Sequence, residues 1–593
     1  MVLVDRSVLA IRHATLLAGT MLLIACAPEG PDDRRAATEA VDPAPAAAPA
    51  YAGVTACADC HADIVDAWRS SNHRQAMELP TPDTVLGDFA DSSFEHQDVT
   101  SRFAERDGQY LVRTDGPDGE PAEFPVRYTF GAYPLQQYLL ELPGGKLQAL
   151  SVAWDTRPAD EGGQRWFHVY GDEPIDADDL LHWTRPSQNW ETMCADCHST
   201  ALSTRYDVDN DRFDTTYKEI NVACEACHGP ASRHIDWAKD PGSSDDAGLL
   251  NLLNERDGIA WIMDPETGNS RRSAPRTTSR EINTCAPCHA RRAEIGELGV
   301  PGGELLDAYL PAFIDPPLYH VDGQVLDEVY VYGSFLQSKM HAKGVTCGDC
   351  HDPALYARTE HTLHAPGSVG ADCVECHMRP SNFMQIDARN DHSFRVPRPH
   401  LAAEFDTPVS CLNCHADQDA AWAAGVLDSY GMTPPAEPVH WSRLLAGAGR
   451  LPAESRNLLL GIAAEATNPP IIRATAMARL NLQGDSLGVA VIGQQLASNK
   501  ALIRLGAARA LQTAVPEARA RLVPPLLDDP VKAVRMAAVM SLAPLGPEVL
   551  PAGTQQSFNA AVDEYIAAQL LNAERGEAHT NIANLQRHLG RNN

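Results

Sequence analysis

The pentapeptide Cys57-Ala58-Asp59-Cys60-His61 decides how this chain of 593 residues folds, because six further copies of its pattern follow. Each copy has two cysteines three positions apart and a histidine directly after the second cysteine. The seven copies, numbered motif 1 to motif 7 in chain order, are Cys57/Cys60/His61, Cys194/Cys197/His198, Cys224/Cys227/His228, Cys285/Cys288/His289, Cys347/Cys350/His351, Cys373/Cys376/His377 and Cys411/Cys414/His415. A random chain of this composition would hold on the order of 0.01 such pentapeptides.

The spacing within each motif has a chemical reason. Two cysteines three positions apart reach the two vinyl groups of one haem and form thioethers, and the adjacent histidine becomes the proximal ligand of the iron. A zinc site does not need a histidine after every second cysteine, and a thioredoxin-like pair does not recur seven times with a histidine. We therefore predict seven covalent c-type haems and their irons.

The fifteenth cysteine, Cys26, follows an N-terminal segment typical of export. Arg6 and Arg12 form a basic region, and an apolar stretch at 15–24 is too short for a spanning helix. The sequence of residues 22–26, LLIAC, resembles the lipobox of bacterial lipoproteins, which implies cleavage before Cys26 and acylation of its sulfur. The alternatives are a plain cleavage site or an uncleaved anchor. We expect a lipoprotein signal peptide at 1–25 and an exported protein in the periplasm or at the cell surface, as an outer-membrane lipoprotein without disulfides.

Composition divides the remaining chain into three segments. Residues 26–50 are rich in alanine and proline and are expected to be a flexible linker. Residues 51–430 hold all seven motifs and form the predicted heptahaem domain, in which residues 85–170 contain aromatic and β-branched runs typical of a small β insertion. Residues 437–593 contain no cysteine and show helical periodicity.

The last segment repeats with a period of 31 residues. The repeated positions are Ile472/Ile503/Val534, Ala476/Ala507/Ala538 and Leu480/Leu511/Leu542. This pattern resembles HEAT-type α-solenoid repeats, and 565–589 resembles the start of a tetratricopeptide unit; the alternative is unrelated helices in coincidental register. The predicted fold is mainly α with irregular loops: a multihaem cytochrome c domain with a small β insertion, followed by a HEAT-like α-solenoid.

A bis-histidine haem needs a second, distal histidine on its iron in addition to the histidine of the motif. The chain has 22 histidines, of which seven are proximal. From their places near the motifs, the candidate distal ligands are His73, His234, His341, His392, His361, His364 and His182, with one of His361 and His364 expected to serve. The alternative for each is a surface or hydrogen-bonded core histidine.

Three stretches carry a resemblance to a known family. Motif 1 followed by Trp68 and His73, and motif 3 followed by His234, resemble the multihaem cytochromes c related to the tetrahaem electron carrier of ammonia-oxidising bacteria. Residues 391–399, DHSFRVPRP, resemble a signature of longer relatives with helical repeats at the C-terminus. The resemblance implies an electron carrier, although larger cousins include hydroxylamine-oxidising and nitrite-reducing enzymes.

Two function classes remain open at this point. Bis-histidine irons carry electrons, whereas an enzyme needs at least one open iron with a polar distal pocket. We favour a carrier; the alternative is a multihaem oxidoreductase acting on a small nitrogen or sulfur compound, and we assign no catalytic residue. The formal net charge of −31 repels nucleic acid and anionic lipid headgroups. The predicted partners are redox proteins docked by the C-terminal repeats, and the membrane through the lipid on Cys26.

Overall fold

The computed structural model describes residues 48–241, 246–266, 269–297, 299–351, 364, 368–432, 439–450 and 452–591. The predicted signal peptide, Cys26, almost all of the predicted linker and His361 lie outside these residues. In the described part of the chain, no helix combines the length and the apolar character needed to cross a bilayer.

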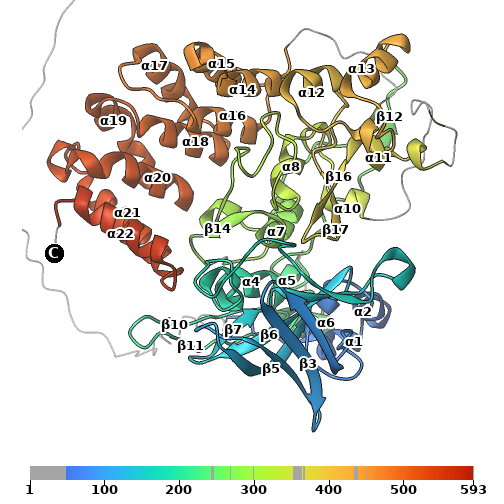
Figure 1. Cartoon of the computed structure of the whole chain (residues 1–593). Helices are drawn as coiled ribbons and strands as arrows, with labels where there is room; N and C mark the ends of the chain where they lie inside the picture. Colours follow the sequence, from blue (N-terminus) through green and yellow to red (C-terminus); the bar gives the residue numbers. More distant parts are fainter. Residues whose placement is uncertain are drawn as a thin grey trace, which may run out of the picture. The chain divides into compact units, whose positions relative to one another are not determined.

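The N-terminal part combines motif 1 with a large antiparallel sheet (Figure 1). Motif 1 begins on α1 (Val54–Ala58), and α2 (Ala62–Arg69) and a short 3₁₀-helix, η1 (Arg74–Ala76), follow it. The strands are β1 (Met77–Glu78), β2 (Ala90–His96), β3 (Val99–Arg106), β4 (Gln109–Asp115), β5 (Pro121–Phe130), β6 (Leu135–Leu142), β7 (Lys146–Ala149), β8 (Val152–Asp155) and β9 (Arg165–His168). Their order is β2-β3-β4-β5-β6-β8-β9, with β1 paired to β5 and β7 to β6.

Aromatic side chains fill one face of this sheet. The ring of Phe89 lies edge-on to Phe103, Tyr110, Tyr138 and Trp166, with ring centroids 5.1 to 5.7 Å apart. Such edge-to-face contacts stabilise a core beyond the area they bury. The predicted β insertion is therefore present, but its nine-stranded sheet is larger than the small sheet expected, because the polar strands β2 to β4 carry too few apolar runs to stand out in sequence.

Short helices and hairpins make up the rest of the motif region. The helices are α3 (Trp190–Met193), α4 (Ala195–His198), α5 (Cys224–His228), α6 (Ser232–Lys239), α7 (Arg280–His289), α8 (Tyr332–Gln337), α9 (Lys339–Ala342), α10 (Cys347–Cys350), α11 (Cys373–His377), α12 (Pro399–Phe405) and α13 (Ala420–Ser429). The hairpins are β10 (Tyr206–Asp207) with β11 (Arg212–Phe213), β12 (Trp261–Met263) with β13 (Ser270–Arg272), β14 (Arg292–Glu294) with β15 (Tyr309–Pro311), and β16 (Pro380–Phe383) with β17 (Asp387–Asn390). This matches the expected short helices and irregular loops.

The C-terminal part consists of helices only, among the residues described. They are α14 (Trp441–Arg450), α15 (Pro452–Ala464), α16 (Pro470–Ala478), α17 (Ser486–Gln495), α18 (Ala501–Leu511), α19 (Pro516–Leu522), η7 (Pro524–Asp528), α20 (Lys532–Leu542), α21 (Gln555–Leu570) and α22 (Gly576–His588), with the short 3₁₀-helices η8 (Ala543–Leu545) and η9 (Pro547–Val549) after α20. The nine repeated apolar positions fall in or just after α16, α18 and α20, and none is more than 3 % exposed. The 31-residue period thus marks equivalent core positions of three alternate helices, which α17 and α19 separate along the chain.

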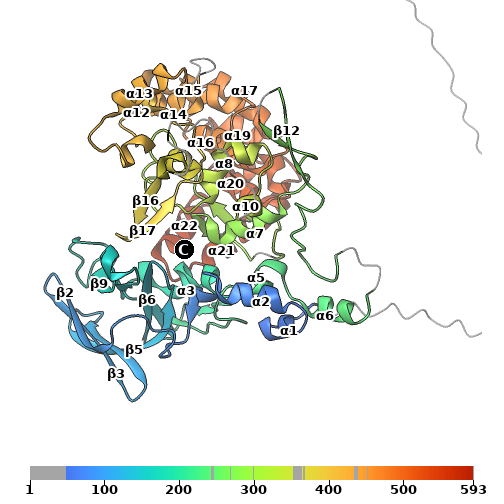
Figure 2. The ribbon, with the colours of Figure 1, turned by 90° about the vertical axis from the view of Figure 1, so that its right-hand side faces the viewer.

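One hydrophobic core joins these helices to the second half of the motif region. It runs from Ile282 on α7 to Leu585 on α22 and includes α8, which lies beside α16 (Figure 2). The backbone N–H of Ile314 donates to Thr475 Oγ1 (3.1 Å), and that of Lys532 donates to Asp307 Oδ1 (2.8 Å). The compositional boundary between residues 430 and 437 is therefore not a boundary of the core.

Candidate functional site

Every motif lies on or directly beside a short helical turn. Motifs 2 to 6 overlap α4, α5, α7, α10 and α11, motif 1 begins on α1, and motif 7 begins on a 3₁₀-helix, η6 (Ser410–Asn413). Helical residues three positions apart share one face, so this local structure brings the two sulfurs of a motif to the same side. The sequence spacing and the observed backbone agree on a two-point attachment.

Motif 7 departs from the α-helical form of motifs 3 to 6. Its second cysteine, Cys414, lies just beyond η6 as the residue that ends it, and its side chain is exposed. The backbone N–H of Cys414 donates to the carbonyl of Cys411, and the N–H of His415 donates to the same oxygen at 3.0 Å. A 3₁₀ turn therefore takes the place of an α-helix between the two sulfurs. The thioethers assigned to all fourteen motif cysteines, Cys414 among them, stay predictions.

The motifs lie against one another in pairs. The thiols of Cys57 and Cys224 are within hydrogen-bonding reach, as are those of Cys285 and Cys347. Burial, and after it the thiol of Cys224, raises the pKa of Cys57 to about 11. Motifs 1 and 3, and motifs 4 and 5, are therefore immediate neighbours.

Motifs 6 and 7 form a third pair. The helix of motif 6, α11, packs against η6 of motif 7. Burial, followed by the charge of Cys411 and more weakly by that of Cys414, raises the pKa of Cys376. Both cysteines of motif 7 therefore lie near the second cysteine of motif 6.

A buried carboxylate connects motif 1 to motif 3. Glu225, which is 3 % exposed, accepts hydrogen bonds from the backbone N–H groups of Ala52, Gly53 and Ala231, each at 2.8 Å. Gly53 has φ 86°, and a Cβ there would lie 2.9 Å from Glu219 Oε1, so only glycine suits this close approach. Glu219 itself accepts from the N–H of Val54 at 3.1 Å.

Motif 2 is connected to motif 4 by a partly buried ion pair. Asp196 of motif 2 binds the guanidinium of Arg292 and accepts a hydrogen bond of 2.7 Å from the hydroxyl of Tyr309. Arg292 also lies 3.7 Å from the sulfur of Cys197, and the thiols of Cys197 and Cys288 are in contact. The β14–β15 hairpin that supplies Arg292 and Tyr309 therefore fixes the separation of the two motifs.

The remaining neighbours complete a continuous series. Asn251 donates to the carbonyl of Cys227 (2.9 Å) and to Thr284 Oγ1 (2.8 Å), which joins motif 3 to α7 of motif 4. Glu281 of α7 accepts from the N–H of Gly348 in motif 5 at 2.5 Å. The segment 390–395 then joins motifs 5 and 6. All seven motifs are thus linked through contacts between described residues.

Backbone carbonyls fix the ring orientation of five histidines. In each, Nδ1 lies within hydrogen-bonding distance of a carbonyl oxygen, which can only accept, so Nδ1 carries the proton and Nε2 is left free to bind a metal. The pairs are His198 with Ala76 (3.1 Å), His228 with Asn251 (2.8 Å), His377 with Arg395 (2.6 Å), His234 with Ala247 (2.8 Å) and His392 with Asn390 (2.8 Å).

The rings of three motif histidines each lie about 6 Å from a second imidazole ring. The ring centroids are 6.1 Å apart for His61 and His234, 6.4 Å for His289 and His73, and 6.3 Å for His415 and His364. A metal–imidazole bond is about 2.0 Å, and the centroid lies about 1.1 Å behind the nitrogen, so two rings on one iron span about 6.2 Å. These pairs therefore fit a bis-histidine iron.

Local packing presents these second histidines. His234 lies on α6, directly after the Gly229-Pro230 turn that ends motif 3. The carbonyl of His73 accepts from the N–H of Val222 at 3.2 Å, which holds it beside the motif region. A Cβ on Gly370 would lie 2.5 Å from the ring of His364, so glycine leaves that ring its space.

The other candidate ligands have different surroundings. Burial, followed by the positive charge of Arg276, lowers the pKa of His341 to about 4, and its Nε2 lies 3.0 Å from Arg276. His392 lies close enough to His351 for the charges of the two rings to interact. Both ring nitrogens of His182 are within hydrogen-bonding distance of other side chains, Asp115 (2.9 Å) and Thr184 (2.8 Å). His182 therefore fits the alternative of a hydrogen-bonded core histidine rather than that of an iron ligand.

Comparisons with known proteins bear on the first three motifs. A family model described as cytochrome c554 and c-prime matches residues 56–97 and 178–229, which contain motifs 1 to 3. These segments support covalently bound haem c. No curated protein matches the chain. Among solved structures, the outer cell wall cytochrome OcwA matches with 16 % identity and a TM-score of 0.37, over 78 % of this chain and 99 % of that one.

Proposed function

We propose that this chain is an electron carrier of the cell envelope that holds seven c-type haems. The observation that carries the proposal is the continuous series of contacts, some through intervening residues, that links the seven motifs, with histidine pairs at the span of one iron in three of them. When bound, the haems supply reversible one-electron chemistry at each motif. Motif peptides in contact bring such groups close to one another.

The residues of the chain then have defined tasks. The fourteen motif cysteines, Cys414 included, attach the haems, and the seven motif histidines bind the irons from one side. We assign His234, His73 and His364 as the second ligands of the irons at His61, His289 and His415. His392 is the assignment for His351, while His341 and His361 remain candidates for the other irons. Carbonyl acceptors such as that of Arg395 keep Nε2 of the ligand unprotonated.

The location and the partners form the rest of the proposal. The lipobox-like residues before Cys26 support export and a lipid anchor on that sulfur, which would hold the carrier at a membrane. The helices α14 to α22, if they behave as HEAT-like repeats, offer an extended surface of the kind such repeats use for docking. A redox protein is the proposed partner there.

A second function, an oxidoreductase with one open iron, has one observation in its favour. Arg379, Arg395 and Arg398 line a small pocket beside His377 of motif 6. Burial, followed by the charge of Arg395, lowers the pKa of Arg398 to about 10. Asp322, which pairs with Arg395, and Asp391 also line this pocket, so three arginines face two carboxylates. The excess of one positive charge beside an open iron would attract a nitrogen or sulfur oxyanion, and the same arginines would hold haem propionates.

Electron paramagnetic resonance of the oxidised, lipid-free protein tests both functions. A carrier with bis-histidine irons gives only low-spin signals, and its mass shows seven added haems. The variants His234→Ala, His73→Ala and His364→Ala should each convert one haem to a high-spin, CO-binding form. The control His588→Gln changes an exposed histidine and should change nothing. A high-spin haem in the unaltered protein would favour the oxidoreductase, and unchanged spectra in all three variants would refute the ligand assignment.

A further inference from the structure

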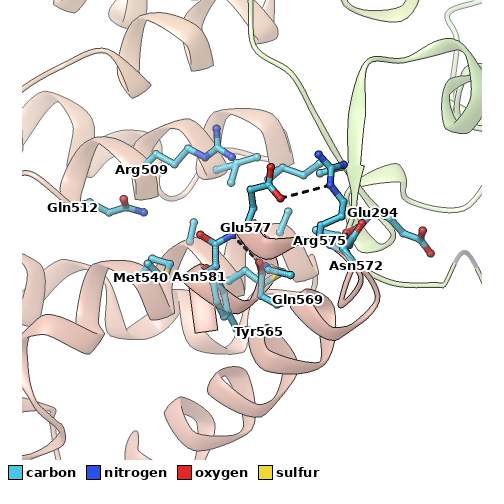
Figure 3. A pocket seen from close by; sticks show the side chains of 18 residues that line it. Glu294, Arg509, Gln512, Met540, Tyr565, Gln569, Asn572, Arg575, Glu577 and Asn581 are labelled. Carbon is cyan, nitrogen blue, oxygen red and sulfur yellow. Dashed lines mark hydrogen bonds and ion pairs between the residues drawn. The ribbon is translucent and has the colours of Figure 1, made fainter. Parts of the chain in front are cut away.

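A pocket of about 410 Å³ lies where the β14–β15 hairpin meets the C-terminal helices (Figure 3). Helices α18, α20, α21 and α22 form its other walls. Its volume falls within the roughly 300–1,000 Å³ of pockets that bind small organic molecules. No motif cysteine or histidine is among its lining residues, so the pocket is separate from the proposed haem sites.

The walls of the pocket are largely apolar. The apolar side chains that line it include Ile295, Leu310, Leu505, Met536, Ala537 and Met540. Methionine is flexible and polarisable, so two of them on one wall adapt to the shape of a ligand and make favourable contacts with aromatic rings. This wall favours an apolar or aromatic body over a sugar or a free inorganic ion.

One side of the pocket holds a cation without a counter-ion. Arg509 lies over the ring of Phe313, 4.7 Å from its centroid, and among the described residues no carboxylate is within ion-pair distance of it. The nearby Asp315 instead pairs with Arg479 at 3.4 Å. Burial lowers the pKa of Arg509, and the charge of Asp315, which is beyond ion-pair distance, opposes this shift only in part. Two carboxylates, Glu294 and Glu577, also line the pocket, but Glu577 pairs with Arg575 and burial raises the pKa of Glu294 to about 7, so an anion at the Arg509 guanidinium would still be stabilised.

Most polar groups on the opposite side of the pocket have a hydrogen-bond or ion-pair partner. Arg575 pairs with Glu577 at 3.8 Å, and Asn581 donates to Gln569 at 2.8 Å (Figure 3). The hydroxyl of Tyr565, by contrast, has no hydrogen-bond partner among the described residues. Two groups on different helices, Arg509 and Tyr565, therefore line one apolar pocket with unused donors.

We propose that this pocket binds a small organic carboxylate with an apolar or aromatic body. The carboxylate lies on the guanidinium of Arg509, the body packs against Met536 and Met540, and the hydroxyl of Tyr565 is available to a second polar group. This inference is independent of the proposed electron transfer, because it uses neither a motif residue nor a haem.

Isothermal titration of the full-length, haem-loaded protein tests the inference with 2-naphthoate as the probe. Its neutral isostere, 2-naphthylmethanol, measures the apolar contribution alone. We expect saturable 1:1 binding of naphthoate, at least about tenfold tighter than the alcohol, because a charge-assisted hydrogen bond is worth about that factor or more. Arg509→Gln should remove this tenfold preference. The matched control, Arg521→Gln on α19, changes an exposed arginine outside the pocket and should keep it.

A second variant keeps the test decisive if Arg509→Gln folds poorly. Ala537→Leu adds volume within the apolar wall and should weaken the binding of both probes, while circular dichroism and the haem absorption spectrum remain unchanged. Absence of saturable naphthoate binding to the unaltered protein would overturn the inference. So would a naphthoate preference that persists in Arg509→Gln, or naphthoate affinity that is unchanged in Ala537→Leu.

Discussion

Replacement of Glu225 by alanine should loosen the connection between motifs 1 and 3. The carboxylate accepts three backbone hydrogen bonds of 2.8 Å, from Ala52, Gly53 and Ala231, and is almost completely buried. A hydrogen bond to a charged group contributes about 1.5–3 kcal/mol. Because water entering the vacated space recovers part of the loss, we expect a local cost of about 3–6 kcal/mol.

Hydrogen exchange followed by mass spectrometry measures this cost directly. A loss of about 3 kcal/mol corresponds to about a hundredfold faster exchange in peptides covering residues 50–60 and 229–235. Glu219→Ala provides a graded control, because Glu219 accepts a single hydrogen bond of 3.1 Å, from the N–H of Val54 next to Gly53. Its replacement should cost only about 1 kcal/mol. The reasoning is refuted if Glu225→Ala exchanges no faster than Glu219→Ala.

Two further predictions concern charge. Arg504 binds Asp529 through hydrogen bonds of 2.6 and 2.8 Å, and the two side chains are 12 % and 4 % exposed. Arg504→Met should therefore lower the free energy of unfolding, measured in urea, by about 3–5 kcal/mol. Arg69→Met, which breaks the exposed ion pair with Asp66, should lower it by less than about 1 kcal/mol, and equal effects of the two variants would contradict this prediction. Burial, followed by the charge of His96, lowers the pKa of His168 from 6.5 to about 4. Since the unfolded chain then binds more protons between these values, this part of the stability is complete above pH 6.5 and is lost as the pH falls toward 4. His168→Phe should flatten the fall in melting temperature between about pH 7 and pH 5, and an unchanged slope would exclude His168 as its source.

The sequence showed the local motifs more readily than the contacts between distant residues. The spacing of the motif residues is local chemistry, so both cysteines and the histidine could be read directly. The partner of His73 could not, because this residue follows motif 1 by twelve positions yet its ring lies beside His289 of motif 4. Likewise, nothing in the sequence around His182 indicates that Asp115, on a distant strand, binds its ring.

The same distinction applies to the fold. The 31-residue period predicted which faces of α16, α18 and α20 are buried, because a periodic pattern reports burial directly. It did not reveal that these helices share a core with α7 and α8, since apolar residues such as Ile314 do not specify which surface they pack against. The size of the β sheet was underestimated for a related reason: strands such as β2 are half exposed and therefore polar in sequence.

The final helical hairpin has a consequence for how the protein is made. Glu574 accepts a hydrogen bond from Thr192, and Arg575 contacts the sulfur of Met193, so the loop between α21 and α22 covers the chain directly before Cys194, although it lies 382 positions later in the sequence. Because these contacts cover the segment before Cys194, motif 2 is more accessible when α21 and α22 are not packed against it. For the proposed cytochrome we therefore expect that motif 2 receives its haem before α21 and α22 pack beside it.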